Sequence, residues 1–397
     1  MLVPLLRALQ AATPSRPKLL TVGGLDVVAT GVANSYGVAP ESITVREAGP
    51  GQVSDMTLTI TDPSAQVAIA DGLPVSYWDN TRDMPIFRGW VESYRVRDFG
   101  IGRAIEVKCI GIEAVLDWLY SPAITIPAGL TWVGAWQSLV ANALGSAGIA
   151  LNVNADPVGG LSTVAHPVEA PASTTLGAIA VPAGSLRQAL QAFTDAALAE
   201  SALTSVTFLF TVDFYGGLRV GIWSLLYPPT TLYDDYAIAT FSDAGPVRPS
   251  RLVWGYNDSG TPRSAYVNGT GAGLGIVSDG SGLPGPTAVI GDATINTQPK
   301  RDALAAIYLR SNAGAASGSV TAEGGLTLGT PAAQVRPPAP VRITHAGVGL
   351  TSATDFVMRA IVKTWAPSGE ETWTIEFGGY APRGSQYLRT LTNDRLV

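Results

Sequence analysis

Cysteine and histidine side chains carry much of the metal and nucleophile chemistry of proteins, and this chain has few of them. It contains one cysteine, Cys109, and two histidines, His166 and His345, which are far apart in the sequence. These residues cannot form a zinc site of the common kinds, so we expect no metal and no cofactor. A single cysteine also excludes an internal disulfide.

The individual residues favour structural roles. Cys109 alternates with Val107 in an apolar strand, which predicts a buried, unreactive thiol. His345 follows a predicted strand; it could partner a metal or a catalytic triad, but we favour a solvated loop histidine.

Other catalytic signatures are weak. No serine lies in a Gly-x-Ser-x-Gly elbow. The segment Gly269–Gly275 has the spacing of a phosphate loop, but Leu274 takes the sixth position and no Lys-Ser or Lys-Thr follows. The adjacent carboxylates Asp234-Asp235 and Glu370-Glu371 lie in predicted turns, whereas a glycosidase needs two carboxyls across a groove. We therefore expect no catalytic, cofactor-binding or metal-binding residues, and no enzymatic activity.

The tryptophans offer a different chemistry, since exposed indoles can stack on sugars. Nine tryptophans are present, and Trp78, Trp90, Trp365 and Trp373 recur at matched places in two similar segments. Indole rings at matched positions in strands are more simply explained by core or inter-subunit packing. We favour that interpretation, and a carbohydrate-binding module stays open as an alternative.

The composition indicates a β-rich assembly protein. The chain has 397 residues, enough for two or three domains, and only 14% of them are charged. Low charge with 44 glycines and 28 prolines suits a loop-rich protein that covers much of its surface with neighbours. A net charge of −6 without a basic run argues against sequence-specific nucleic-acid binding. We expect no membrane span and no signal peptide, and assembly in the cytoplasm.

The pattern of apolar residues predicts the elements. Strands are expected near residues 19–22 and 25–28, around Gly23-Gly24, and at 56–61, where Met56, Leu58 and Ile60 face one side. With three more strands up to Gly111, the first part offers six or seven strands. Further expected elements are a helix at 132–144, a helix opened by the capping box Ser185–Gln188, a hairpin at 206–223, a strand at 251–256, loops at 258–297 and a helix at 299–310.

The end of the chain repeats a piece of its beginning. Residues 74–111 and 340–378 each read as strand, turn, long strand, turn, strand and glycine, over 38 and 39 residues. The match is one of pattern and spacing, so two ordinary meanders remain possible. The pattern predicts three equivalent pairs of positions: Val75 with Val341, Val91 with Ile361, and Val107 with Ile375.

The predicted fold class is mainly β with an α+β middle. The predicted domains are residues 1–113, an N-terminal arm and a first barrel; 114–248, a mixed α/β middle; and 249–397, a second barrel with long loops 258–297.

The arrangement resembles the baseplate hub or tail-hub proteins of long-tailed phages. The residues that carry the resemblance are Gly72–Tyr77, Phe87–Val91, the strand around Val107, and the short helix Ala114–Leu119 that follows it; the helix Arg301–Arg310 before the final meander also looks like part of that family's second barrel. The resemblance implies two tail-tube-like β-barrels flanking a mixed middle, in a homotrimeric ring of six barrels.

The resemblance also implies a function. Such a ring would adapt a hexameric tail tube to threefold tip proteins and form part of the DNA-ejection channel in the virion tail tip. Expected partners are the tail tube or distal tail protein ring, tail-tip or fibre proteins and the tape measure protein. The alternatives are a distal tail protein of the same tail tip, which would not repeat its barrel, and a carbohydrate-binding adhesin module.

Overall fold

The computed structural model describes most of the chain. It covers residues 18–27, 37–49, 52–79, 84–100, 102–146, 162–163, 175–200, 206–212, 217–224, 239–243, 249–257, 262–269, 276–280, 282, 284–291, 296–311, 315–323, 337, 340–368 and 370–378. The expected residues His166 and Asp234-Asp235, and most of the segment Gly269–Gly275, lie outside this part.

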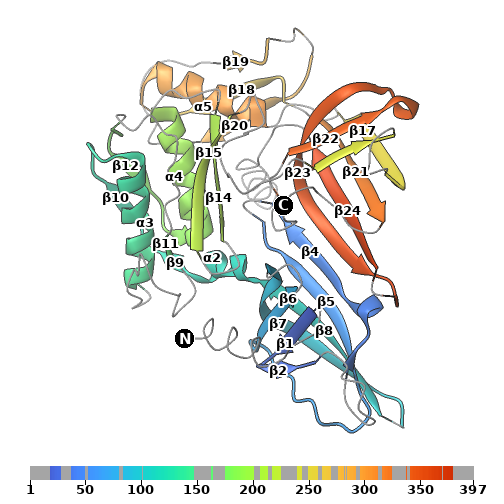
Figure 1. The fold of residues 1–397 in the computed structure, drawn as a ribbon. Coiled ribbons are helices and arrows are strands. Elements are labelled where there is room, and N and C mark those ends of the chain that lie inside the picture. Colours follow the sequence, from blue (N-terminus) through green and yellow to red (C-terminus); the bar gives the residue numbers. More distant parts are fainter. Residues whose placement is uncertain are drawn as a thin grey trace.

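In the described part of the chain, one large sheet of 14 strands organises the molecule. Its members are β1 (Lys18–Val22), β2 (Leu25–Asp26), β3 (Gly37–Val38), β4 (Thr44–Ala48), β5 (Asp55–Asp62), β6 (Pro74–Asp79), β7 (Met84–Asp98), β8 (Arg103–Gly111), β16 (Ala239–Ser242), β17 (Arg251–Asn257), β21 (Ala315–Glu323), β22 (Pro340–His345), β23 (Leu350–Trp365) and β24 (Glu371–Gly378). The mainly β fold class is therefore confirmed. Figure 1 shows β21–β24 in orange and red continuing into the blue strands of the N-terminal part.

The helical middle lies beside this sheet (Figure 1). Its helices are α2 (Val115–Trp118), α3 (Trp132–Ser146) and α4 (Leu186–Glu200), with short strands β9 (Tyr120–Ser121), β10 (Ile124–Ile126), β11 (Ser162–Thr163), β12 (Ile179–Val181) and β13 (Gly184–Ser185) and the hairpin β14 (Val206–Val212) and β15 (Gly217–Ser224). The capping box is confirmed: the Gln188 N–H donates to Ser185 Oγ at 3.3 Å, and the Ser185 N–H donates to Gln188 Oε1 at 3.0 Å. Leu186, Leu190 and Phe193 of α4 are buried in the core of this middle part.

Two five-strand units repeat within the large sheet. We call β4-β5-β8-β7-β6 the first unit and β17-β21-β24-β23-β22 the second, in their order across the sheet. Every neighbouring pair in both units is antiparallel. In each unit the second strand in chain order pairs with the last strand of the meander, which is the arrangement of a Greek key. The predicted repeat is thus present as strand order and extends beyond the three strands expected.

The predicted equivalences between single residues are wrong in register. Val91 lies opposite Cys109 in the first unit, and Ile361 lies opposite Ile375 in the second. If Val91 and Ile361 are equivalent, the partner of Ile375 is Cys109 and not Val107.

The outer strands of the two meanders are also out of step. Val75 lies opposite Gly89, and Val341 lies opposite Phe356. The two hairpins differ in length, because the β7–β8 ladder continues for six positions beyond Val91–Cys109 and the β23–β24 ladder for four beyond Ile361–Ile375. Bulges after Val91 and Met358 add one further residue to each long strand, so residue counts along the sequence do not match positions in the sheet.

The predicted loop region 258–297 contains strands, so the loop prediction is wrong there. β18 (Ser264–Asn268), β19 (Ile276–Ser278) and β20 (Thr287–Gly291) form a three-stranded sheet. Buried Val267 and Ile290 pack against Leu304 of α5 (Gln298–Ser311). The short apolar runs are separated by glycine, serine and proline, which hid the period-two pattern.

This insertion joins β17 to β21, the strands equivalent to β4 and β5. α5 belongs to it and contacts α4, so α5 is not part of the second unit as the sequence suggested. Within the described residues the large sheet shows no pair of strands that would close a barrel. β16, which lies in the range assigned to the middle, pairs with β22 in parallel.

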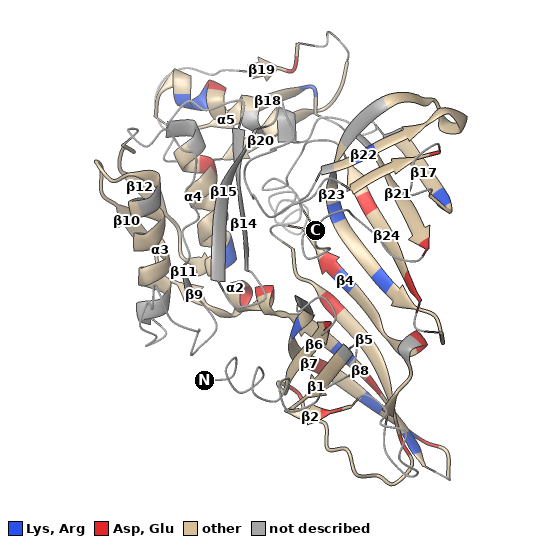
Figure 2. Cartoon of the chain, viewed as in Figure 1, with Lys and Arg blue, Asp and Glu red and all other residues tan. Residues whose placement is uncertain are grey.

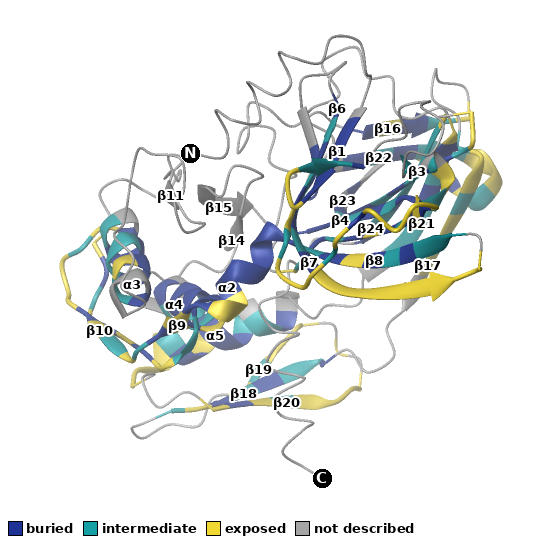
Figure 3. Ribbon diagram, turned by 90° about the horizontal axis from the view of Figure 1, so that it is seen from below, coloured by how far each residue is buried: buried dark blue, intermediate teal, exposed yellow. Residues whose placement is uncertain are grey.

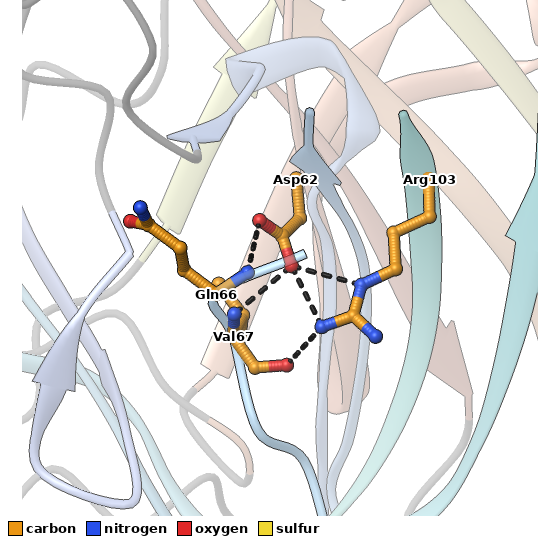
Figure 4. A network of polar contacts seen from close by, with 4 residues as sticks. All are labelled: Asp62, Gln66, Val67 and Arg103. Atoms are coloured by element: carbon orange, nitrogen blue, oxygen red, sulfur yellow. Dashed lines mark hydrogen bonds and ion pairs between the residues drawn. The ribbon is translucent and has the colours of Figure 1, made fainter. Parts of the chain in front are cut away.

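A buried carboxylate holds the end of β5 (Figure 4). Asp62 is fully buried and accepts hydrogen bonds from the N–H groups of Gln66 and Val67, each at 2.9 Å. Arg103 of β8 donates to Asp62 Oδ2 at 2.9 Å and to the Val67 carbonyl at 2.6 Å. Burial acts to raise the pKa of Asp62, but the hydrogen bonds from Val67, Gln66 and Arg103 outweigh it, so the pKa is lowered.

We expect Asp62→Asn to lower the free energy of unfolding by about 2–4 kcal/mol near neutral pH, because the charge that Arg103 faces is lost. A lowered folded-state pKa means that this contribution is fully present above the ordinary carboxyl pKa of about 4 and is lost as the pH falls through the folded value. Urea unfolding at pH 7 and below pH 4 measures both effects, and the gap between variant and wild type should close in acid.

A matched control lies on the neighbouring strand. Glu106 pairs with Arg97 at 2.7 Å, but both side chains are about half exposed. Glu106→Gln should therefore cost less than about 1 kcal/mol. Equal losses in the two variants would contradict a structural role for the Asp62 network.

Candidate functional site

The most informative polar site lies in the contact between the two five-strand units, which we call the seam. In the seam β4 of the first unit pairs antiparallel with the second half of β23, from Ala48 opposite Ala360 to Thr44 opposite Thr364. Gly49 follows β4 here, and a Cβ atom at this position would lie 2.7 Å from the Arg359 carbonyl oxygen. The close approach of the two backbones therefore requires glycine at this position.

A buried ion pair crosses the seam. Lys363 Nζ of β23 lies 3.0 Å from Glu47 Oε2 of β4, and both side chains are at most 5% exposed. The Lys363 ammonium also lies 4.9 Å from the centre of the Trp373 ring, within the range of a cation–π contact. An ion pair this deeply buried links the two units because neither charge can be left alone without a large desolvation cost.

Tryptophan side chains complete the seam. The indole N–H of Trp365 donates to Glu371 Oε1 at 3.2 Å, and that of Trp373 donates to Glu371 Oε2 at 3.1 Å. Trp365 ends β23, yet its ring lies in the core of the first unit, where it meets Tyr77 edge-to-face with ring centres 5.4 Å apart. Burial and the nearby carboxylates of Glu371 and Asp79 raise the pKa of Tyr77. Figure 3 shows buried residues along β4, β22 and β23.

These positions decide between the interpretations of the aromatic and acidic residues. Trp365 and Trp373 are buried, so packing rather than sugar stacking is confirmed for them. Trp90 is half-buried and rests on Trp118, with ring centres 4.9 Å apart. Glu371 receives two indole donors, whereas its neighbour Glu370 is exposed, so they do not form a pair of acids facing each other across a groove.

The remaining chemistry-bearing residues are separate from the seam. Cys109 is buried on β8, as expected, and burial together with the Glu92 carboxylate raises the pKa of its thiol to about 12. His345 is half-buried at the end of β22, not in a solvated loop. Within the described ranges, no three His, Cys, Asp or Glu side chains gather as metal ligands would. No helix there is long and apolar enough to span a bilayer.

Sequence reasoning missed the Glu47–Lys363 pair. A signal was present, because Lys363 alternates with Ile361 and Trp365 and so faces the core side of an apolar strand. A lysine at such a position needs a buried counter-charge. The sequence did not identify the counter-charge, since Glu47 is 316 residues away along the chain.

The middle part is attached to the first unit by a second set of polar contacts. Arg187 of α4 donates to Asp117 Oδ1 at 2.7 Å and to the Glu113 carbonyl at 2.8 Å. The Glu113 carboxylate accepts a hydrogen bond from Ser54 at 2.9 Å. Figure 2 shows charged residues distributed along the strands of the sheet, whereas α3 contains none.

Solved structures supply the comparison. No protein-family model and no curated protein sequence matches this chain. A tail protein from Neisseria meningitidis MC58 matches with a TM-score of 0.60 and 12% identity, over 91% of this chain and 96% of that one. The 43 kDa tail protein of prophage MuSo2 from Shewanella oneidensis also gives 0.60, with 11% identity over 91% and 98% of the two chains.

A third structure matches with a lower TM-score. The prophage tail protein gp18 from Listeria monocytogenes EGD-e gives a TM-score of 0.53 and 8% identity, over 95% of this chain and 99% of that one. Identities this low establish similarity of fold alone. With the repeated units and the helical middle described above, these matches show that the chain has the fold of phage tail proteins.

Proposed function

We propose that this chain is a structural component of a phage tail tip that forms a trimeric hub ring. The observation that carries the proposal is the repeat of one five-strand unit in the same order within a single chain. Three copies then present 2 × 3 = 6 similar units, which fits a sixfold tail tube on one side and threefold tip proteins on the other. The fold similarity to phage tail proteins over nearly the whole chain supports the same assignment.

The proposed location is the virion, at the tail tip, after assembly in the host cytoplasm. The partners are the tail tube or distal tail protein ring, tail-tip or fibre proteins, and the tape measure protein. The ring would form part of the channel for DNA ejection. A net charge of −6 suits such a channel, because like charge discourages DNA from sticking to its wall.

The repeat also separates this proposal from its alternatives. A distal tail protein would carry one such unit. An adhesin would place its tryptophans at the surface, whereas Trp365 of β23 and Trp373 of β24 are buried. We infer a structural and not a catalytic role; turnover of peptidoglycan or polysaccharide that one carboxylate substitution abolishes would contradict it.

Electron microscopy of the purified protein, alone and mixed with its tail-tube partner, tests the proposal. We expect rings with threefold symmetry and six similar lobes, and light scattering at micromolar concentration should give a trimer or a monomer that trimerises with the partner. A stable dimer or tetramer in the assembled tail tip would overturn the hub assignment.

A further inference from the structure

The strands that correspond to the two seam strands do not pair with each other within one chain. Pairing of β4 with β23 joins the first unit to the second. By the repeat, β17 is the equivalent of β4, and β7 is the equivalent of β23. Among the described strands β17 pairs only with β21, and β7 beyond Val91 pairs only with β8. Each therefore has one edge with no described strand beside it, at the place where its equivalent is covered.

The ladders fix which residues correspond. The matched pairs are Val91–Cys109 and Ile361–Ile375. Two residues further toward the hairpin, counted along β8 and β24, Tyr94 lies opposite Val107 and Lys363 lies opposite Trp373. Tyr94 is thus the equivalent of Lys363.

The same steps relate further positions in the two units. Val96 is the equivalent of Trp365. Leu252, opposite Val320, is the equivalent of Val45, opposite Met56.

Burial differs sharply between the two members of each pair. Lys363 and Trp365 are 4% and 5% exposed, whereas Tyr94 and Val96 are 43% and 46% exposed. All four lie on the core side of their strands, since the residues opposite Tyr94 and Val96 are the buried Val107 and Ile105.

The β17 edge shows the same difference. Val45 is fully buried, while its equivalent Leu252 is only partly covered and the neighbouring Val253 is 49% exposed. Apolar side chains at two free strand edges are a liability for a monomer and a normal feature of an edge that receives another strand.

We propose that the free edge of β7 in one copy pairs antiparallel with the free edge of β17 in a second copy of this chain. This inference rests on the proposed hub function and names the contact that would build it. The register carried over from the seam places Leu252 of one copy opposite Tyr94 of the next, as Val45 lies opposite Lys363. The contact is heterologous, so it generates a closed ring if the rotation between copies closes and a filament if it does not.

Cysteine crosslinking tests the pairing directly. In the double variant Tyr94→Cys with Leu252→Cys, opposite positions in an antiparallel pair bring the Cβ atoms within about 4.5–5.5 Å, close enough for a disulfide after slight adjustment. Mild oxidation should give covalent oligomers from the double variant, while each single variant stays monomeric on a denaturing gel. The native Cys109 is buried and does not compete. A control pairs Tyr94→Cys with Val289→Cys, since Val289 is exposed on β20 of the insertion and should give no such products.

The crosslink pattern separates the two proposals. Covalent species that stop at three chains support both the pairing and the ring. A ladder that continues past three chains supports the pairing and overturns the hub ring. If microscopy shows a threefold ring but no crosslinks form, the pairing is overturned and the hub proposal stands. If neither crosslinked oligomers nor rings are found, both proposals are contradicted.

A charge substitution provides an independent readout. Val96→Glu should raise the protein concentration needed for assembly at least tenfold, because it would bury a carboxylate in the contact. The circular dichroism spectrum of the monomer should stay that of the wild type. Val289→Glu introduces the same change at an exposed apolar position of the insertion and should assemble normally. Equal assembly of the two variants would overturn the pairing.

Discussion

Glu47→Ala is expected to lower the free energy of unfolding by about 3–5 kcal/mol, because it leaves the Lys363 ammonium buried without its counter-charge. The two groups lie 3.0 Å apart, with almost no exposure of either side chain. The ring of Trp373, 4.9 Å from the ammonium, can replace only a small part of this interaction. Urea unfolding followed by far-ultraviolet circular dichroism measures the loss.

The matched control is Glu376→Ala, which lies near the seam but on the other face of the sheet. Glu376 of β24 lies 3.6 Å from Arg46 of β4, but these side chains are 45% and 33% exposed. Water already solvates this pair, so its loss should cost less than about 1 kcal/mol. If the two glutamate variants lose the same stability, the buried pair does not hold the seam.

A double substitution separates a pairing effect from a packing effect. Glu47→Leu with Lys363→Met removes both charges and keeps apolar volume in the seam. Replacing both members of a buried pair in this way is often neutral or stabilising, whereas removing one is not. We expect the double variant to regain most of the stability that Glu47→Ala loses. A double variant as unstable as the single one would mean that the volume of the side chains, not their charge, matters here.

The repeated order of strands could be predicted from the sequence, because alternation of apolar residues along a strand is a local property. Met56, Leu58 and Ile60 were expected on one face of β5, and all three are buried. The capping box at Ser185 and the helix it begins are local for the same reason. Such signals lie within a few residues of one another, where sequence and structure correspond directly.

The register of the repeat and the seam could not be predicted in this way. The ladder of β7 with β8 continues for six positions beyond Val91–Cys109, to Asp98–Arg103, whereas that of β23 with β24 continues for four beyond Ile361–Ile375, so counting residues gave Val107 where the ladder has Cys109. Pairing of β4 with β23 depends on the free edges that the two units leave after they fold, which no local pattern encodes. The insertion that carries β18–β20 was missed because its strands have only three to five residues.

The seam also leads to the second large effect, at Trp365. This indole is supplied by the last residue of β23 but lies in the core of the first unit against Tyr77. Trp365→Ala leaves a cavity there and should lower the free energy of unfolding by about 3–5 kcal/mol. Trp365→Phe keeps a ring in the cavity and loses the hydrogen bond to Glu371, so it should cost distinctly less.

Trp118→Ala is the control, because the ring of Trp118 is 57% exposed although it rests on Trp90. We expect a loss below about 1.5 kcal/mol for this change. If Trp365 joins the two units, Trp365→Ala should also uncouple them. A protease should then cut the connection between β23 and β24 at a lower urea concentration than it does in the wild type. If Trp365→Ala and Trp118→Ala have equal effects on stability and on protease cutting, the indole in the first core is not what holds the second unit to it.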